Sequence, residues 1–284
     1  IIAAKALMDG VKIKQNFACR GAGIYVDISS IYYASEITLK CSNEYGVTEI
    51  IDNGTTDSST AANGGGIYFC GGNLNIGAGV KINKNKAQEG GGVYLINASS
   101  CNISADSGSS ISEISENTAL LSGAGVFMNG SGESANFTMN GGKISDNSVL
   151  DPDGNPAGYG GGIYTEVDAK ISINGGIIEN NQAWQGGAVF ITAISNTFSI
   201  KSSAKITPST GEDKDKPGKN DIFLGSNNKI KIEKQLTADG QMARITPDNY
   251  STGTQILGAA SGVDLANEVN KFVVTPNIGS TPED

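Results

Sequence analysis

Apolar and polar residues recur in a fixed order through residues 10–190 of this chain. Each repeat begins with an isoleucine, which is followed by an asparagine three positions later and by a small or branched residue two positions beyond. A glycine-rich turn and an apolar–aromatic pair come next, and a segment of alternating apolar and polar residues completes the repeat. Alternation with a period of two is typical of β-strands, so each repeat predicts three short strands joined by turns.

The glycine–aromatic part of the repeat occurs six times, and its closest copies are 26 residues apart. One such unit cannot bury its own apolar side chains, so units must stack, with strands about 4.8 Å apart. The sequence therefore predicts an all-β fold, a right-handed parallel β-helix with about six regular three-strand coils and irregular terminal coils. The six copies span residues 21–25, 64–68, 90–94, 123–127, 160–164 and 186–190.

Stacking in register predicts that equivalent residues form ladders along the helix axis. Because side chains alternate across a strand, one ladder should face the core and its neighbour should face outward as an aromatic stack. The expected inward ladder is Ile24, Ile67, Val93, Val126, Ile163 and Val189. The expected aromatic stack is Tyr25, Tyr68, Tyr94, Phe127, Tyr164 and Phe190.

The repeated asparagines predict a third ladder, in which stacked side-chain amides bond to the coils above and below. We interpret this ladder as structural, and a glycan-binding row of amides is the functional alternative. The residues are Asn16, Asn53, Asn85, Asn117, Asn147 and Asn181.

The regular repeats predict a β-helix over residues 1–208, with residues 209–284 as degenerate coils and a C-terminal cap of the same domain. Residues 204–208, 243–247 and 274–276 look like weakened copies of the alternating segment that ends each repeat. Proline in these segments cannot donate to a strand ladder, which is why irregular coils are expected there.

Two insertions fall at one corner of the predicted coil. The gap from asparagine to aromatic residue is nine residues in three repeats, but 15 from Asn53 to Tyr68 and 17 from Asn147 to Tyr164. Insertions at one corner of a solenoid collect on one face, which is often the binding face.

The longer insertion carries a candidate Ca²⁺ site. Asp151, Asp153 and Asn155 place oxygen ligands at alternate positions, as in the first half of many Ca²⁺ loops. The twelfth position is Gly162, so Glu166 or backbone carbonyls would have to complete the coordination. The same residues are typical of an ordinary exposed turn, and both interpretations stay open. No other cofactor is expected.

Composition excludes several classes of function. The formal charge is −9 with no histidine, so neither a basic nucleic-acid surface nor imidazole catalysis is expected. No apolar run approaches the roughly 20 residues of a transmembrane helix. The four cysteines lack the spacing of a zinc site, and they are expected to be buried thiols or to form a disulfide between adjacent coils.

Acidic residues beside the asparagines provide the enzymatic alternative. Glu116, Asp146 and Glu179 are expected to align across coils, with Lys84 at the same position in another coil. Such a row is either a solvated stripe or the carboxylate site of a polysaccharide lyase or hydrolase.

The Ile-x-x-Asn-x-Ala element followed by Gly-Gly-[Gly/Ala]-[Ile/Val] resembles the repeats of chlamydial polymorphic outer-membrane proteins. The resemblance covers roughly residues 10–190 and implies a pectate-lyase-like β-helix exported to the bacterial surface, with adhesion attributed to it. Isoleucine stands where that family commonly has its first phenylalanine, and glycine often replaces alanine.

We therefore expect a non-catalytic scaffold at the cell surface or outer membrane, or secreted, which binds a host surface protein or glycan. A polysaccharide lyase or hydrolase, or a structural stalk, is the alternative.

Overall fold

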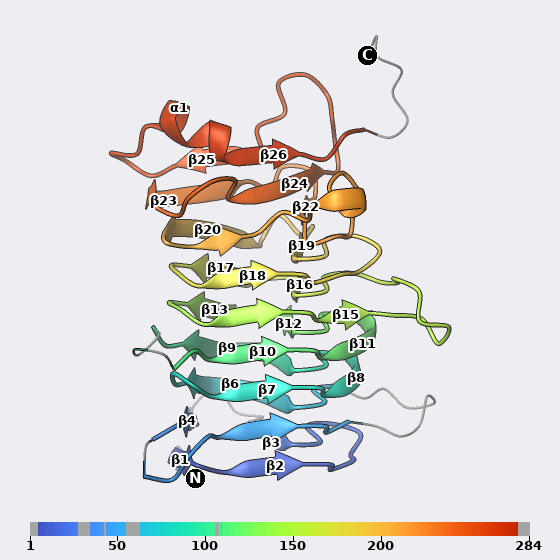
Figure 1. The fold of residues 1–284 in the computed structure, drawn as a ribbon, viewed down its shortest axis with the longest axis vertical. Helices are drawn as coiled ribbons and strands as arrows, with labels where there is room; N and C mark the ends of the chain where they lie inside the picture. Colours follow the sequence, from blue (N-terminus) through green and yellow to red (C-terminus); the bar gives the residue numbers. More distant parts are fainter. Residues whose placement is uncertain are drawn as a thin grey trace.

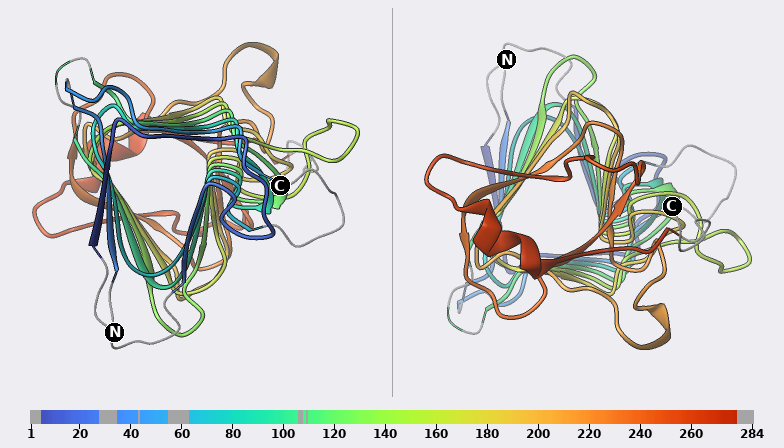
Figure 2. Two further views of the ribbon diagram at one scale, coloured as in Figure 1. Left: turned by 90° about the horizontal axis from the view of Figure 1, so that it is seen from below. Right: turned by 90° about the horizontal axis from the view of Figure 1, so that it is seen from above.

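A computed structural model describes residues 5–27, 35–42, 44–54, 63–105, 108 and 110–277. The chain winds coil upon coil from its N-terminal to its C-terminal end, and every pair of named strands is parallel (Figure 1). Viewed along the axis, the coils superpose as a triangle with a lobe at one corner (Figure 2). This arrangement confirms the predicted right-handed parallel β-helix.

The triangle has three faces, which we number in the order in which the chain follows them. The first face consists of β3 (Ile24–Asp27), the starts of β6 (Ile67–Ile76) and β9 (Val93–Ile103), β12 (Val126–Asn129), β16 (Ile163–Thr165), β19 (Val189–Ile191), β22 (Ile222–Leu224), β24 (Ala243–Pro247) and β26 (Phe272–Val274). The second face consists of β1 (Lys5–Asp9), β4 (Glu36–Lys40), the ends of β6 and β9, β13 (Ala135–Met139), β17 (Ala169–Ile173), β20 (Thr197–Ser202), β23 (Ile230–Leu236) and β25 (Leu257–Ala259).

The remaining elements form the third face, the lobe and the last turns. The third face consists of β2 (Lys12–Lys14), β5 (Glu49–Ile51), β7 (Lys81–Asn83), β10 (Glu113–Ser115), β14 (Lys143–Ser145), β18 (Ile177–Glu179) and β21 (Lys205–Ile206). The lobe contains β8 (Lys86–Glu89), β11 (Thr118–Ser122) and β15 (Ser148–Val149). The helices are η1 (Gly211–Asp213), α1 (Leu265–Glu268) and η2 (Val269–Lys271).

The core is a continuous column of aliphatic side chains from all three faces. On the first face, Ile67 pairs with Val93, and Val93 pairs with Val126, and all three are fully buried. The ladder predicted to face inward does so. On the third face, the isoleucines of successive repeats stack directly on one another, as Ile82, Ile114 and Ile144 do. One coil therefore covers the apolar surface that the next one exposes.

The asparagine side chains form a continuous ladder beside this column. Asn117 donates from both its backbone N–H and its Nδ2 to Oδ1 of Asn147, at 3.0 and 2.9 Å. Asn147 repeats these contacts with Asn181, and its Nδ2 also donates to the Ile114 carbonyl at 2.9 Å. Asn220 continues the ladder, because it accepts from Asn181 in the same way. In each regular repeat, the residue before the ladder asparagine has a left-handed backbone conformation, as Asp146 does at φ 58°.

The glycine turns bring adjacent coils closer than other residues allow. A Cβ atom on Gly91 would lie 2.4 Å from the carbonyl oxygen of Thr118 in the next coil, and Gly90 has φ +64°. The first glycine of the turn is therefore needed for its left-handed backbone conformation, and the second is needed because a side chain would collide with the backbone of the next coil.

Residues beyond 208 continue the coils differently from the prediction. Residues 204–208 contain β21 on the third face, whereas 243–247 form β24 and 274 ends β26, both on the first face. The interpretation of these segments as copies of one element is therefore wrong. Their shared apolar–Thr–Pro composition reflects similar strand ends on two different faces.

Candidate functional site

A stack of seven aromatic rings runs along the outside of the first face. Neighbouring ring centroids are 4.5–5.5 Å apart and the rings are within 24° of parallel. The predicted stack of six is present, and Phe223 extends it. The rings are Tyr25, Tyr68, Tyr94, Phe127, Tyr164, Phe190 and Phe223. Most of them are buried against each other, so the stack is a second, smaller apolar cluster outside the main core.

A row of side chains from the lobe faces this stack. Each residue immediately precedes a glycine turn, and parallel bridges hold the row in register, so we call it the corner ladder. The guanidinium carbon of Arg20 lies 5.7 Å from the centre of the Tyr68 ring, and Tyr159 lies 4.7 Å from Phe190 between ring centres. Its members are Arg20, Asn63, Glu89, Ser122, Tyr159 and Gln185.

Two carboxylates lie beside the middle of the stack. Glu89 accepts a hydrogen bond from Nδ2 of Asn63 at 3.0 Å, and Glu166 accepts one from Nδ2 of Asn129. Partial burial, followed by the negative charge of Glu166, raises the pKa of Glu89 above its usual range. Glu166 is therefore close enough for its charge to act on the Glu89 carboxyl group.

The tyrosines next to these acids stay neutral. Burial, followed by the charge of Glu166, raises the pKa of Tyr164 to about 12. Burial and the charge of Glu89 also raise the pKa of Tyr94. Phe127 lies between them and has no hydroxyl group. The middle of the site thus offers phenol donors and carboxylate acceptors around one apolar ring.

Two aromatic side chains extend from this site into solvent. The indole of Trp184 is 58% exposed and meets Tyr159 edge to face, at 6.0 Å between ring centres and 63° between planes. The backbone N–H of Trp184 donates to the carbonyls of Ala157 and Gly158 at 2.9 and 3.1 Å. The long insertion therefore positions both rings at the corner where the sequence predicts the insertions to collect.

The Asp151–Asn155 segment forms a closed turn at the tip of that insertion. Oδ1 of Asp151 accepts from the backbone N–H groups of Asp153 and Asn155 at 2.9 and 2.8 Å. Nδ2 of Asn155 also donates to Asp151 at 3.2 Å, and Glu166 contacts Asn129 instead of this turn. These bonds lower the pKa of Asp151. The shorter insertion falls on residues 55–62, which lie outside the described residues.

Of the three carboxylates expected in a row beside the asparagines, Glu116 and Asp146 align and Glu179 is displaced by one residue. Glu179 pairs with Ser145, so Asn180 occupies the position equivalent to Glu116 and Asp146. Glu179 forms an ion pair with Lys143 at 2.7 Å. The alignment of Glu179 with the other two acids is therefore wrong.

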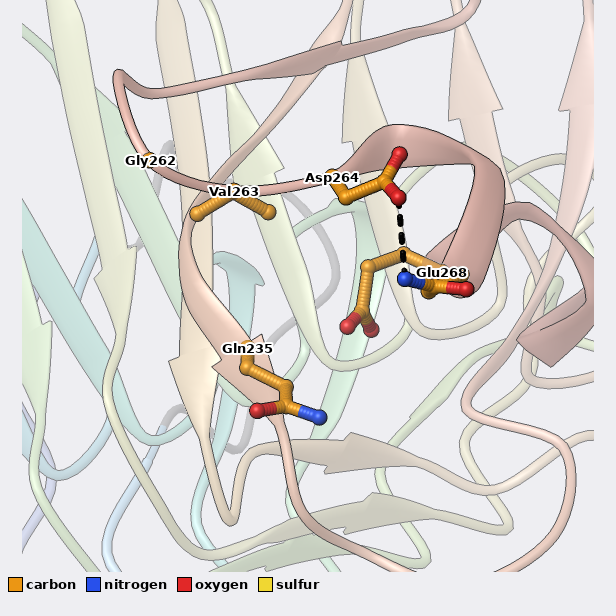
Figure 3. Close-up of a pocket in the computed structure, with 6 residues that line it drawn as sticks. Gln235, Gly262, Val263, Asp264 and Glu268 are labelled. Atoms are coloured by element: carbon orange, nitrogen blue, oxygen red, sulfur yellow. Dashed lines mark hydrogen bonds between the residues drawn. The ribbon is translucent and has the colours of Figure 1, made fainter.

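A cavity of about 170 Å³ lies in the last coil, beside α1 (Figure 3). The buried Glu268 carboxylate points into it, but this group accepts from Lys271 at 2.9 Å and from the Leu236 backbone N–H at 3.4 Å. In the same helical turn, Nδ2 of Asn267 donates to Asp264 at 3.0 Å. These contacts hold the final turn in place.

The sequence did not point to Glu89, Tyr159 or Trp184 as site residues, and it pointed to Glu166 only as a possible Ca²⁺ ligand. The detectable signals were the chain's single tryptophan and the variable residue before each glycine turn. Cys101 is fully buried, where burial raises the thiol pKa to about 12, so it serves as an apolar core residue.

No family model, curated protein or solved structure matches this chain. Within the described residues, no helix has the length and apolar character needed to cross a bilayer.

Proposed function

We propose that this chain is a non-catalytic β-helical scaffold that binds a glycan at the corner bearing Trp184 and Tyr159. The observation that carries the proposal is the exposed Trp184–Tyr159 pair, which continues the aromatic stack into solvent beside polar groups. The resemblance to bacterial surface repeats supports a location at the cell surface or outside the cell.

The chemistry of this corner suits a sugar chain. Exposed aromatic rings provide flat apolar surfaces against which the C–H face of a pyranose can pack, and such residues dominate the energetics of many binding sites. Carboxylate and amide groups beside them can bond to the sugar hydroxyls. Gln185 and Ser122 neighbour Tyr159 in the corner ladder, and Glu89 follows Ser122. Because the ladder runs along the axis, an extended polymer fits it better than a compact ligand.

A glycan array followed by calorimetric titration tests the proposal. The array identifies a binding oligosaccharide, which is then titrated into the wild type and the Trp184→Ala and Tyr159→Ala variants. Each variant should bind at least about tenfold more weakly, which corresponds to about 1.4 kcal/mol. Ile194→Ala is the matched control, because Ile194 is 75% exposed and lies in the turn after β19, away from the lobe. Equal affinities for all four proteins would refute this binding site.

A polysaccharide hydrolase is the second candidate, and the Glu89–Glu166 pair favours it. A carboxylic acid with a raised pKa beside a second carboxyl group is the arrangement that most glycoside hydrolases use. Reducing ends released during the same titrations would support this candidate if Glu89→Gln abolished them while binding persisted. Binding without any product leaves the scaffold proposal standing.

A further inference from the structure

The corner proposed to bind a glycan has two carboxylates that no cation of the described chain balances. Neither Glu89 nor Glu166 forms an ion pair with a lysine or arginine among the described residues. The charge that acts on the Glu89 carboxyl group is the negative one of Glu166. The one cation of the corner ladder, Arg20, is two coils away from Glu89 and lies over the Tyr68 ring. Negative charge is therefore concentrated in the middle of this site.

The same place holds more hydrogen-bond acceptors than donors. Nδ2 of Asn63 and Nδ2 of Asn129 already donate, each to one of the two carboxylates. Oδ1 of Asn129 is buried and has no donor among the described residues. An ionised carboxylate can only accept hydrogen bonds. A ligand that fits here must therefore bring donors, and a positive charge on the donor would offset the repulsion between the acids.

Both acids lie within reach of a ligand that packs on the exposed aromatic pair. Glu89 is two steps from Tyr159 in the corner ladder, which is about 10 Å at the usual strand spacing. Glu166 belongs to the same coil as Tyr159 and accepts from Asn129 in the preceding coil, on the side of Glu89. Tyr164 lies close to Glu166, Glu89 and Tyr159, because these groups, after burial, raise the pKa of its phenol. A chain of a few sugar rings on the aromatic pair therefore reaches both acids.

We propose that the glycan bound at this corner is an amino-sugar polymer, with an ammonium group between Glu89 and Glu166 and a neighbouring ring on Trp184. This inference rests on the proposed function, since it names the class of glycan for the same site. An ammonium group supplies three donors, a positive charge and no acceptor, which is what the two carboxylates lack. An N-acetyl group would remove that charge. A uronate or sulfate would add negative charge beside two acids, in a chain whose formal charge is already −9.

Calorimetric titration with three oligosaccharides of equal length tests this proposal. The probes are oligomers of glucosamine, N-acetylglucosamine and galacturonate, which are cationic, neutral and anionic at a pH where amines are protonated and carboxylates are ionised. The glucosamine oligomer should bind at least about tenfold more tightly than the N-acetylated one. The galacturonate oligomer should bind most weakly. Added salt should reduce the preference for glucosamine, because it screens the charges of the ammonium group and the acids.

Variants of two kinds separate recognition of the amine from recognition of the sugar ring. Glu89→Gln and Glu166→Gln should each weaken the glucosamine complex about tenfold and so bring its affinity close to that of the N-acetylated oligomer. Trp184→Ala should weaken both complexes alike, because the indole contacts the ring and not the amine. Glu212→Gln is the matched control, since it removes one charge from an exposed residue of η1 and should leave the preference unchanged. Circular dichroism should show that each variant is folded.

The outcomes distinguish a failure of this inference from a failure of the proposed function. If no glycan binds, both fail together. If glycans bind and Trp184→Ala weakens them, but the neutral or anionic oligomer binds as tightly as the glucosamine oligomer, only this inference is overturned. A preference for glucosamine that persists when Glu89 and Glu166 are both replaced by glutamine would also overturn it, because another group would then recognise the amine. So would a preference that disappears in EDTA, since that result assigns the two acids to a metal ion.

Discussion

Replacing Asn147 with alanine should destabilise the coil far more than the same change at the end of the asparagine ladder. The Asn147 side chain makes four hydrogen bonds: Nδ2 donates to Asn181 and Ile114, and Oδ1 accepts twice from Asn117. All of these contacts lie in the buried interior, where alanine and its neighbours have no water to replace them.

The expected magnitude follows from this count. At about 0.5–1.5 kcal/mol for each bond, losing four bonds should lower the free energy of unfolding by about 2–6 kcal/mol. Asn16 is the matched control, because its exposed side chain makes a single bond, from Nδ2 to Asn53 at 2.9 Å. Asn16→Ala should therefore cost about 1 kcal/mol or less.

Urea denaturation followed by circular dichroism measures both variants against the wild type. The shift in midpoint should be much larger for Asn147→Ala. Glycan affinity should not change in molecules that remain folded, because the Asn147 side chain is fully buried and cannot touch a ligand. If the two substitutions cost the same, the interior amides do not act as a cooperative ladder and the reasoning fails. Loss of glycan binding at wild-type stability would instead assign Asn147 to the binding site.

Two further predictions concern the acids of the lobe and its insertion. Because the pKa of Glu89 is raised in the folded state, its contribution to stability is present below its unfolded pKa and is lost as pH rises through the folded value. The melting temperature of Glu89→Gln should thus be higher than that of the wild type at neutral pH and equal to it at low pH. Glu133 is exposed, so Glu133→Gln should have the melting temperature of the wild type at every pH. Equal melting curves for Glu89→Gln and the wild type at neutral pH would contradict the prediction. Millimolar Ca²⁺ should give no saturable heat and no change in melting temperature, because the Asp151 carboxylate is already bonded within its own turn; saturable binding that Asp153→Ala abolishes would establish the Ca²⁺ site.

The repeated positions of this chain predicted the fold because each has one physical task in every coil. Isoleucine fills the column, asparagine bridges the turn, and glycine allows close approach, so the spacing of these residues reports the path of the backbone. The aromatic stack follows from the same periodicity. The number of hydrogen bonds that each asparagine side chain makes does not follow from the periodicity, because it depends on how successive turns are placed along the helix axis.

The predicted asparagine ladder ends at Asn181 and misses its next member, Asn220, because that coil departs from the spacing. Asn220 joins the ladder 14 residues after Ile206, because residues 209–219 intervene between the strand and the turn. Asp221 then replaces the usual glycines, and its carboxylate accepts the backbone N–H groups of Gly187 and Gly218 at 2.8 and 2.9 Å. A search for the isoleucine–asparagine spacing cannot find this member of the ladder, because Asn220 reaches the ladder in space without the regular spacing in sequence.

The corner ladder escaped prediction for the opposite reason: its geometry repeats while its residues do not. Arg20, Glu89 and Tyr159 occupy equivalent places before a glycine turn, yet they share no size, charge or polarity. Residues that hold one coil on the next must be alike, because each faces the same neighbours, and that similarity is what a repeat search detects. A position that faces solvent and the aromatic stack carries no such constraint, so it is free to differ from coil to coil. Ligand recognition requires this kind of variation along a regular frame, and the places where a solenoid's sequence is least periodic are therefore where its binding chemistry should be sought.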